Sequence, residues 1–171
     1  MTEETRTPVH DGLEIVIRSY NPVADLDALR SCIIEQQEFH RGLESSWPEG
    51  HAIINDYVNH LERQCTLHNG RLIVAECAGE LVGFVCVVAS TNGDSPDDPA
   101  PFAWIHDIFV KPAHRRQHAA TRLMAEAESF ARASGAHLLR LGVLARNEGA
   151  RTFYREHGYR DYVCVLTKSL D

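Results

Sequence analysis

Long apolar runs are absent from the sequence. No stretch approaches the roughly 20 consecutive apolar residues that a helix needs to span a bilayer, which argues against a membrane protein or a membrane partner. The opening residues, MTEETRTPVHDG, are polar and acidic, whereas a secretory signal needs an apolar segment. We therefore expect a cytoplasmic protein with a flexible lead over residues 1–12 and a single domain over residues 13–171.

Paired cysteines and clusters of metal ligands are also missing. The five cysteines are widely spaced without a Cys-x-x-Cys pair, and we expect most of them to be small core residues in a reducing compartment. The ten histidines are scattered and show no spacing typical of a zinc site, so we expect no metal. The net charge of −7 argues against a nucleic-acid partner and is compatible with cationic substrates.

Hydrophobic periodicity predicts strands and helices that alternate along the chain. The expected strands are residues 13–18, 71–77, 81–89, 103–110, 138–144 and 159–166. The expected helices are residues 26–40, a segment around residues 54–65, residues 118–133 and residues 147–157. The order β-α-α-β-β-β-α-β-α-β indicates the α/β class, with a mixed sheet and helices packed on its faces. The later strand-helix-strand units predict parallel neighbours and right-handed crossovers.

A basic turn between an expected strand and an expected helix is the most informative segment. It reads VKPAHRRQHAATR over residues 110–122, with four cations and no acidic residue. Helix starts normally favour a Ser, Thr, Asp or Asn cap and acids in the first turn, and none of these lies around Gln117 and His118. Free backbone N–H groups and cations therefore meet, which suits a phosphate. A solvated surface turn would explain the charge equally well.

A second segment, NEGARTFYREHGY over residues 147–159, has the features of a short capped helix. Asn147 is a good N-cap and Gly158 closes the helix. Ala150 and Phe153 point inward in this arrangement. On physical grounds alone, Tyr154 is explained more simply as a core or rim aromatic than as a functional group.

Together the two segments resemble the GNAT (GCN5-related N-acetyltransferase) family. The basic turn resembles the acyl-CoA pyrophosphate loop, V-x-P-x-x-R/Q-x-x-G-x-G/A, in which His118 stands where the first glycine normally lies. Such a histidine either crowds a phosphate or faces it with its imidazole. The second segment resembles the signature N-x-x-A-x-x-F-Y-x-x-x-G-F/Y at nearly every position. The resemblance covers roughly residues 70–165 and implies a GNAT-like acyl-CoA N-acyltransferase fold, with substrate specificity in the first 70 residues.

The resemblance implies acetyl-CoA as co-substrate and assigns residues to it. The backbone of residues 108–110 would pair with the pantetheine arm and polarise the acyl carbonyl, and the amides of residues 116–121 would hold the pyrophosphate. The implied binding residues are Ile108, Phe109, Val110, Arg115, Arg116, Gln117, His118, Ala119, Ala120, Thr121 and Asn147. Tyr154 would be the general acid at the CoA sulfur.

Three residues are candidates for the base that deprotonates the amine: His106, Asp107 and Glu76. Strict strand alternation places Trp104, His106 and Ile108 on one face and Asp107 on the other, unless a bulge changes the parity. An unperturbed pKa near 6.5 suits His106 to accept a proton at neutral pH.

The run over residues 105–110, IHDIFV, also resembles the L-E-D-F-F-V run of polyamine acetyltransferases. Arylalkylamine acetyltransferases similarly carry a histidine at the position of His106. Alternatively, His106 and Asp107 only order the end of the strand. The side chains of Glu35, Glu38, Glu44 and Trp47 either line a wall for a cationic or aromatic amine or are solvated.

These patterns predict an N-acetyltransferase that transfers acetyl from acetyl-CoA to a primary amine of a small molecule. The catalytic residues would be Tyr154, His106 and Asp107. An acetyltransferase acting on proteins or peptides and a non-catalytic acyl-CoA-binding module remain as alternatives. Homodimers are common in the family, and we expect one here.

Overall fold

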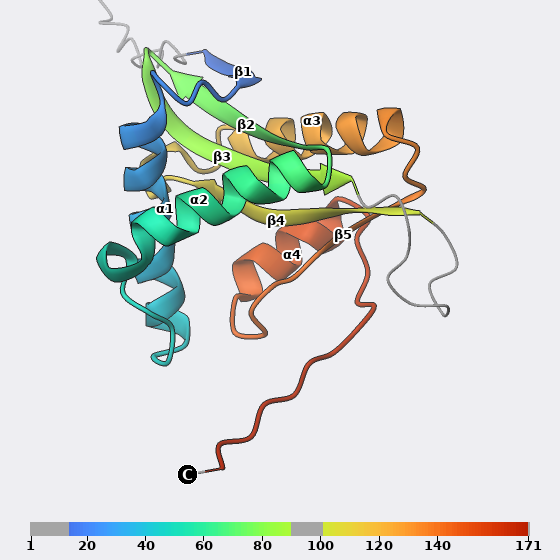
Figure 1. Ribbon diagram of the computed structural model, residues 1–171. Helices are drawn as coiled ribbons and strands as arrows, with labels where there is room; N and C mark the ends of the chain where they lie inside the picture. The colour runs from blue at the N-terminus through green and yellow to red at the C-terminus, as the bar shows by residue number, and fades with distance from the viewer. Residues whose placement is uncertain (1–13, 90–100, 171) are drawn as a thin grey trace, which may run out of the picture.

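The computed structural model describes residues 14–89 and 101–170, so the expected lead over residues 1–12 lies outside the described part. One mixed sheet carries helices on both faces (Figure 1), as expected for the α/β class. In chain order the elements are β1 (Ile15–Ser19), α1 (Leu26–Leu43), α2 (Gly50–Leu67), β2 (Gly70–Cys77), β3 (Glu80–Ala89), β4 (Phe102–Val110), the short 3-10 helix η1 (Pro112–His114), α3 (Ala119–Ala133), β5 (Leu138–Leu141) and α4 (Glu148–Glu156).

The five strands lie side by side in the order β1-β2-β3-β4-β5. The neighbouring strands from β1 through β4 pair antiparallel, and only β4 and β5 run parallel. The parallel pair follows from the crossover through α3, which returns the chain to the same end of the sheet.

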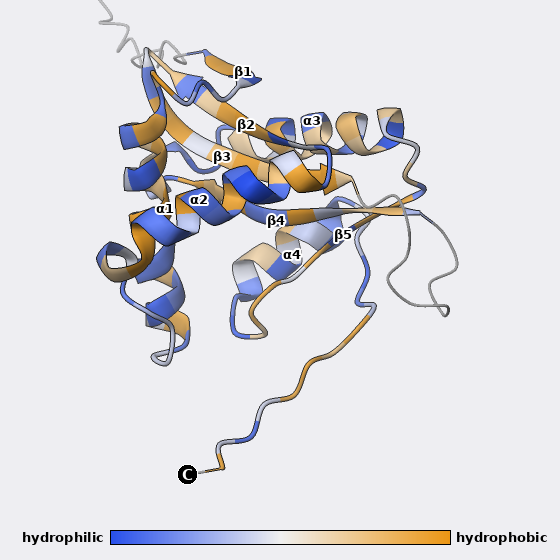
Figure 2. Ribbon diagram, in the orientation of Figure 1, coloured by the Kyte–Doolittle hydropathy of each residue, from blue (hydrophilic) through white to orange (hydrophobic). Residues whose placement is uncertain are grey.

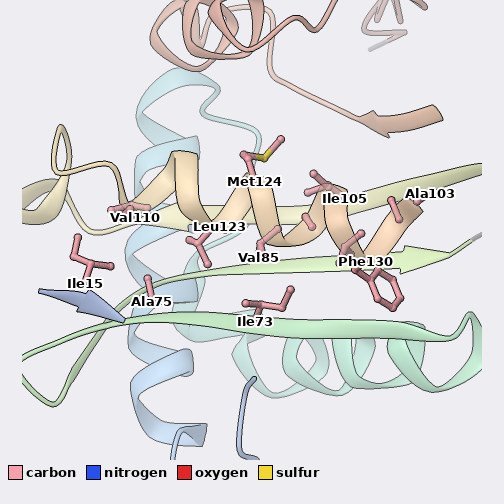
Figure 3. Packing of buried hydrophobic residues seen from close by; sticks show 14 of the residues in the cluster. Ile15, Ile73, Ala75, Val85, Ala103, Ile105, Val110, Leu123, Met124 and Phe130 are labelled. Atoms are coloured by element: carbon pink, nitrogen blue, oxygen red, sulfur yellow. The ribbon is translucent and has the colours of Figure 1, made fainter. Parts of the chain in front are cut away.

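Two apolar cores cover the two faces of the sheet. On one face the inner side of α3, with Leu123, Met124 and Phe130, packs against Val85 and Ile105 (Figure 3). On the other face α1 and α2 pack against β2 and β3. Figure 2 shows that hydrophobic and hydrophilic residues alternate along α1, α2 and α3. These two cores fix β3 and β4, the strands on which the site is built.

A bulge interrupts β4 at His106. The register between β3 and β4 shifts between Cys86 and Val87, which leaves one extra residue on β4. Ile105 lies in the core on the α3 side, and Ile108 packs against the same core three residues later. Strict alternation would put these two isoleucines on opposite faces, but the bulge, which was the stated exception to that prediction, reverses the parity.

The expected last strand, residues 159–166, is not formed. Residues 159–170 are in neither helix nor strand, and residues 160–170 are all exposed, with Leu166 at 90%. In Figure 1 this segment runs away from the body of the protein. The preceding strand is also shorter than expected, since β5 ends at Leu141.

The cysteines divide between the core and the surface. Cys32, Cys77 and Cys86 are buried as expected, Cys65 is half-buried, and Cys164 is exposed in the C-terminal segment.

None of the helices in the described residues is long and apolar enough to cross a membrane.

Candidate functional site

One continuous cleft of about 1660 Å³ runs between the two helical layers and along the bulged part of β4. Its walls come from α1, α2, β4, the turn before α3, and the β5–α4 connection. The volume exceeds the roughly 300–1,000 Å³ of a typical small-ligand pocket. The cleft therefore has room for a large ligand and a second reactant.

Except for Gln117 and the candidate base Glu76, every residue that the sequence pointed to as catalytic or cofactor-binding lines this cleft. The exposed amide of Gln117 instead donates to the carbonyl of Ala113 at 3.3 Å. Of the four residues that either line a wall for the amine or are solvated, only Trp47 lines the cleft. Segments far apart in the sequence thus meet in one place, because α1 and α4 face each other across β4.

The turn before α3 forms the anion-binding end of the cleft. Arg116 and His118 both adopt the left-handed conformation, with φ of 61° and 62°. His118 begins α3 without a side-chain cap, and the first turn has no acidic residue. Backbone N–H groups at such a helix start point into the cleft with the positive end of the helix dipole, a geometry that binds phosphate.

The left-handed φ of His118 explains why a glycine would be usual at this position. A residue with a Cβ is strained in this conformation by about 1 kcal/mol, although histidine tolerates it better than most residues. The imidazole itself lines the cleft.

Arg115 holds the turn in place. Its Nε donates to the carbonyl of Val110 at 3.1 Å, and its guanidinium lies 5.2 Å from the ring centroid of Phe39 and 5.9 Å from that of Phe109. The side chain therefore ties the turn to β4 and α1.

Asp107 is the most deeply buried charged group in the cleft, at 8% exposure. Its Oδ1 accepts a hydrogen bond of 2.6 Å from the amide of Gln36 on α1, and its Oδ2 accepts one from the hydroxyl of Tyr57 on α2. Burial raises the pKa of Asp107 to about 6, against the opposing effect of these two donors. Because both oxygens are engaged, the carboxyl group joins the two helices to β4.

His106, on the bulge, is half-buried and lies beside α2. Its ring meets that of His60 edge to face at 5.8 Å. Burial lowers the pKa of His106, and the neighbouring His60 and His68 lower it further. The imidazole is therefore neutral at pH 7 and free to accept a proton.

Tyr154 projects into the cleft from α4. The carboxamide of Asn147 accepts a hydrogen bond of 3.1 Å from the amide of Ala150, which caps the helix as expected and fixes its start beside the cleft. Burial raises the pKa of Tyr154 to about 12, with a further contribution from the charge of Asp107. The phenol therefore keeps its proton at neutral pH and can donate it.

Glu76 is not near these groups. Its carboxylate lies 2.8 Å from the guanidinium of Arg18, outside the cleft, so the expectation that it is a third candidate base is wrong. Glu38 accepts from the amide of Gly50 at 3.1 Å, and Glu44 lies 3.5 Å from Arg146. These carboxylates order the α1–α2 connection and do not line the cleft.

Sequence reasoning missed the residues that α1 and α2 contribute. Gln36 lies seven residues after Leu29, on the apolar face of α1, and a polar residue at such a position was a signal. Tyr57 gave none, because it continues an apolar helical face. Among the described residues no cluster of three metal-ligating side chains occurs.

Comparison with known proteins identifies relatives. A family model described as "Acetyltransferase (GNAT) family" matches residues 36–159. The uncharacterized N-acetyltransferase YhfO of Bacillus subtilis (strain 168) is 30% identical over 94 residues, which are 55% of this chain and 61% of that protein. The chain thus spans less than two thirds of this relative.

Two solved structures share the fold. The tetramutant of BH1408 protein from Bacillus halodurans has a TM-score of 0.79 at 16% identity, over 91% of this chain and 99% of that one. The aminoglycoside N-acetyltransferase AAC(6')-Iy in complex with CoA has a TM-score of 0.69 at 18% identity, over 95% of this chain and 98% of that one. At these identities the likeness concerns the fold alone.

Proposed function

Because the chain belongs to the GNAT acetyltransferase family, we propose that it transfers acetyl from acetyl-CoA to a primary amine of a small molecule. The observation that carries the proposal is the one cleft that is lined both by an uncapped basic helix start and by His106, Asp107 and Tyr154. A fold neighbour is an aminoglycoside N-acetyltransferase with CoA bound, which supports both CoA and an amine. We also propose that the protein acts in the cytoplasm as a homodimer.

The residues of the cleft fit an acyl-CoA. The pyrophosphate suits the backbone amides of residues 116–121 at the start of α3. The β4–β5 ladder ends at the pair Ile105 and Leu141. Over residues 108–110 the edge of β4 that faces away from β3 therefore has no strand partner among the described residues, and these residues line the cleft. A pantetheine arm has amide groups that can pair with such an edge in the manner of an added strand.

The remaining residues fit a direct transfer. The amine must be neutral to attack, so we assign His106 as the base that takes its proton, directly or through a water molecule. As the new N–C bond forms, the C–S bond breaks and the phenol of Tyr154 gives its proton to the departing sulfur. We assign Asp107 a positioning role, because its two oxygens already accept bonds from Gln36 and Tyr57.

Release of free thiol from acetyl-CoA tests the proposal. The panel contains diamines and polyamines, arylalkylamines, aminoglycosides and short peptides. We expect turnover with at least one small amine and slower turnover with peptides. CoA binding without turnover on any amine would instead identify a non-catalytic binding module.

A paired substitution tests the assignment of the acid. Tyr154→Phe should lower kcat by about 100-fold and change the Kd of CoA little, because it removes only the transferable proton. Tyr20→Phe removes a phenol that lies outside the cleft, 3.4 Å from Glu62, and should leave kcat unchanged. Equal activity of the two variants would remove Tyr154 from the mechanism.

A further inference from the structure

Uncharged rings line the part of the cleft that faces α1 and α2. The ring of Trp47, in the α1–α2 connection, meets that of His40 on α1 edge to face, with the centroids 4.8 Å apart. Tyr57 of α2 and Trp104 of β4 line the same cleft. Burial lowers the pKa of His40 and raises the pKa of Tyr57, so both rings are neutral at pH 7. We call His40, Trp47, Tyr57 and Trp104 the aromatic wall.

The carboxylates closest to this wall along the chain are paired with arginines outside the cleft. Glu38 lies 3.0 Å from Arg41, and Glu49 lies 3.5 Å from the same guanidinium. Glu44 lies 3.5 Å from Arg146. None of these three glutamates lines the cleft, so they offer no partner to a charged substrate there.

The carboxyl groups that do line the cleft are engaged or lie on the opposite wall. Both oxygens of Asp107 already accept hydrogen bonds. Glu148 belongs to the first turn of α4, where the positive end of the helix attracts its charge. Glu156, also on α4, precedes His157, whose ring lies 3.2 Å from the hydroxyl of Thr121 at the start of α3. The aromatic wall therefore has no free carboxylate of its own.

A cation lies at this end of the cleft instead. Arg146 lines the cleft and donates to the carbonyl of Leu43, the last residue of α1, at 3.1 Å. Its pair with Glu44 is exposed and therefore weak. An additional ammonium group on a substrate would meet this guanidinium and would find no carboxylate to replace its lost water.

We propose that the amine acceptor carries a single amino group on a flat aromatic body, as 2-phenylethylamine does, and that polyamines and aminoglycosides are poor acceptors. This inference rests on the proposed function and names the acceptor class of the same site. The aromatic wall buries the apolar body of such an amine. His106, two residues after Trp104 on β4, then takes the proton of its one amino group.

Tryptophan fluorescence tests the preference without any turnover. Trp47 and Trp104 are the two tryptophans of the chain, and both line the cleft, so a bound amine changes their emission directly. The protein is titrated with 2-phenylethylamine, 1,4-diaminobutane and spermidine, each with and without CoA. The dissociation constant of 2-phenylethylamine should be at least about tenfold lower than those of the two polyamines. Equal or tighter binding of the polyamines, or binding of none of the three, would overturn the inference.

Substitutions at Trp47 test whether the ring itself is responsible. Trp47→Ala should raise the Kd of 2-phenylethylamine about fivefold, with Trp104 as the remaining reporter. Trp47→Phe keeps a ring and should restore most of the affinity. Leu67→Ala is the matched control, because this apolar side chain of α2 is 66% exposed and lies outside the cleft, and its Kd should be unchanged. An unchanged Kd in Trp47→Ala would overturn the inference.

Transfer assays separate the failure of this inference from that of the proposed function. A kcat/KM for spermidine equal to or above that for 2-phenylethylamine would overturn the acceptor class and leave the acetyltransferase standing. Tight binding of 2-phenylethylamine without acetyl transfer to it or to any other amine would remove the acetyltransferase and leave the aromatic amine as the ligand of this wall.

Discussion

Replacement of Asp107 by asparagine probes the energetics of the site most directly. The carboxyl group is 8% exposed and accepts bonds from Gln36 and Tyr57. An amide of the same size can keep both contacts, because the carboxamide of Gln36 has an Oε1 atom without a hydrogen-bond partner that can turn toward it. The substitution thus removes the titration of the group with little change in packing.

The expected magnitude follows from the pKa of Asp107. Burial raises it from its ordinary value of 3.8 to about 6, so the folded state holds the proton more tightly than the unfolded state does. The contribution of the group to stability is therefore most favourable below pH 4 and is lost as the pH rises through 6. The difference in pKa corresponds to about 3 kcal/mol.

Urea unfolding of the wild type and of Asp107→Asn at pH 4 and pH 8 measures this effect. The free energy of unfolding of the variant, relative to the wild type, should rise by about 2.4 kcal/mol between the two pH values, because the carboxyl group of the unfolded wild type is already partly ionised at pH 4. The other titrating groups are common to both proteins and cancel. Asp56→Asn, at an exposed position of α2, should show no such change. If the difference in the free energy of unfolding between the two proteins changes by less than about 1 kcal/mol between pH 4 and pH 8, the argument that burial raises the pKa of Asp107 is refuted.

Further substitutions separate the two ends of the cleft. His106→Gln should lower kcat/KM by at least about 100-fold, and the fall in wild-type activity at acid pH, where His106 takes a proton, should vanish from the variant's pH profile. His118→Gly should relieve the left-handed strain, raise the free energy of unfolding by up to about 1 kcal/mol and tighten CoA in calorimetry; weaker binding would show that the imidazole contacts phosphate. Trp47→Ala should raise the KM for the amine several-fold and leave the Kd of CoA unchanged, because this ring lines the cleft beside His40 of α1, with the two ring centroids 4.8 Å apart.

Local patterns predicted most of the fold. Apolar periodicity placed α1 and α3 correctly, because each buries one continuous stripe of its surface against the sheet. The prediction over residues 159–166 is wrong for a different reason. Apolar alternation shows that a segment can form a strand, but pairing also needs a partner edge, and no edge of the described chain lies along this segment.

The candidate site was predictable where it depends on the backbone and less so where it depends on tertiary contacts. The helix start at His118 and the cap at Asn147 are local features, readable from residue types at fixed offsets. The bulge at His106 is not, because the sequence does not show which residue of β4 is left without a partner on β3. Gln36 and Tyr57 meet Asp107 only after both helices have packed on the sheet.

The two walls of the cleft differ in how firmly they are held, and this bears on the chemistry. The proposed base, His106, and the buried carboxyl group of Asp107 lie on β4, between two apolar cores, and residues of α1 and α2 donate hydrogen bonds to that carboxyl group. Tyr154 lies on α4, whose inward residues Phe153 and Tyr154 are only partly buried where they pack against the α3 core. Transfer requires the proton acceptor and the proton donor to reach the same acyl group, so a loosely packed α4 would cost rate even with every reacting residue intact.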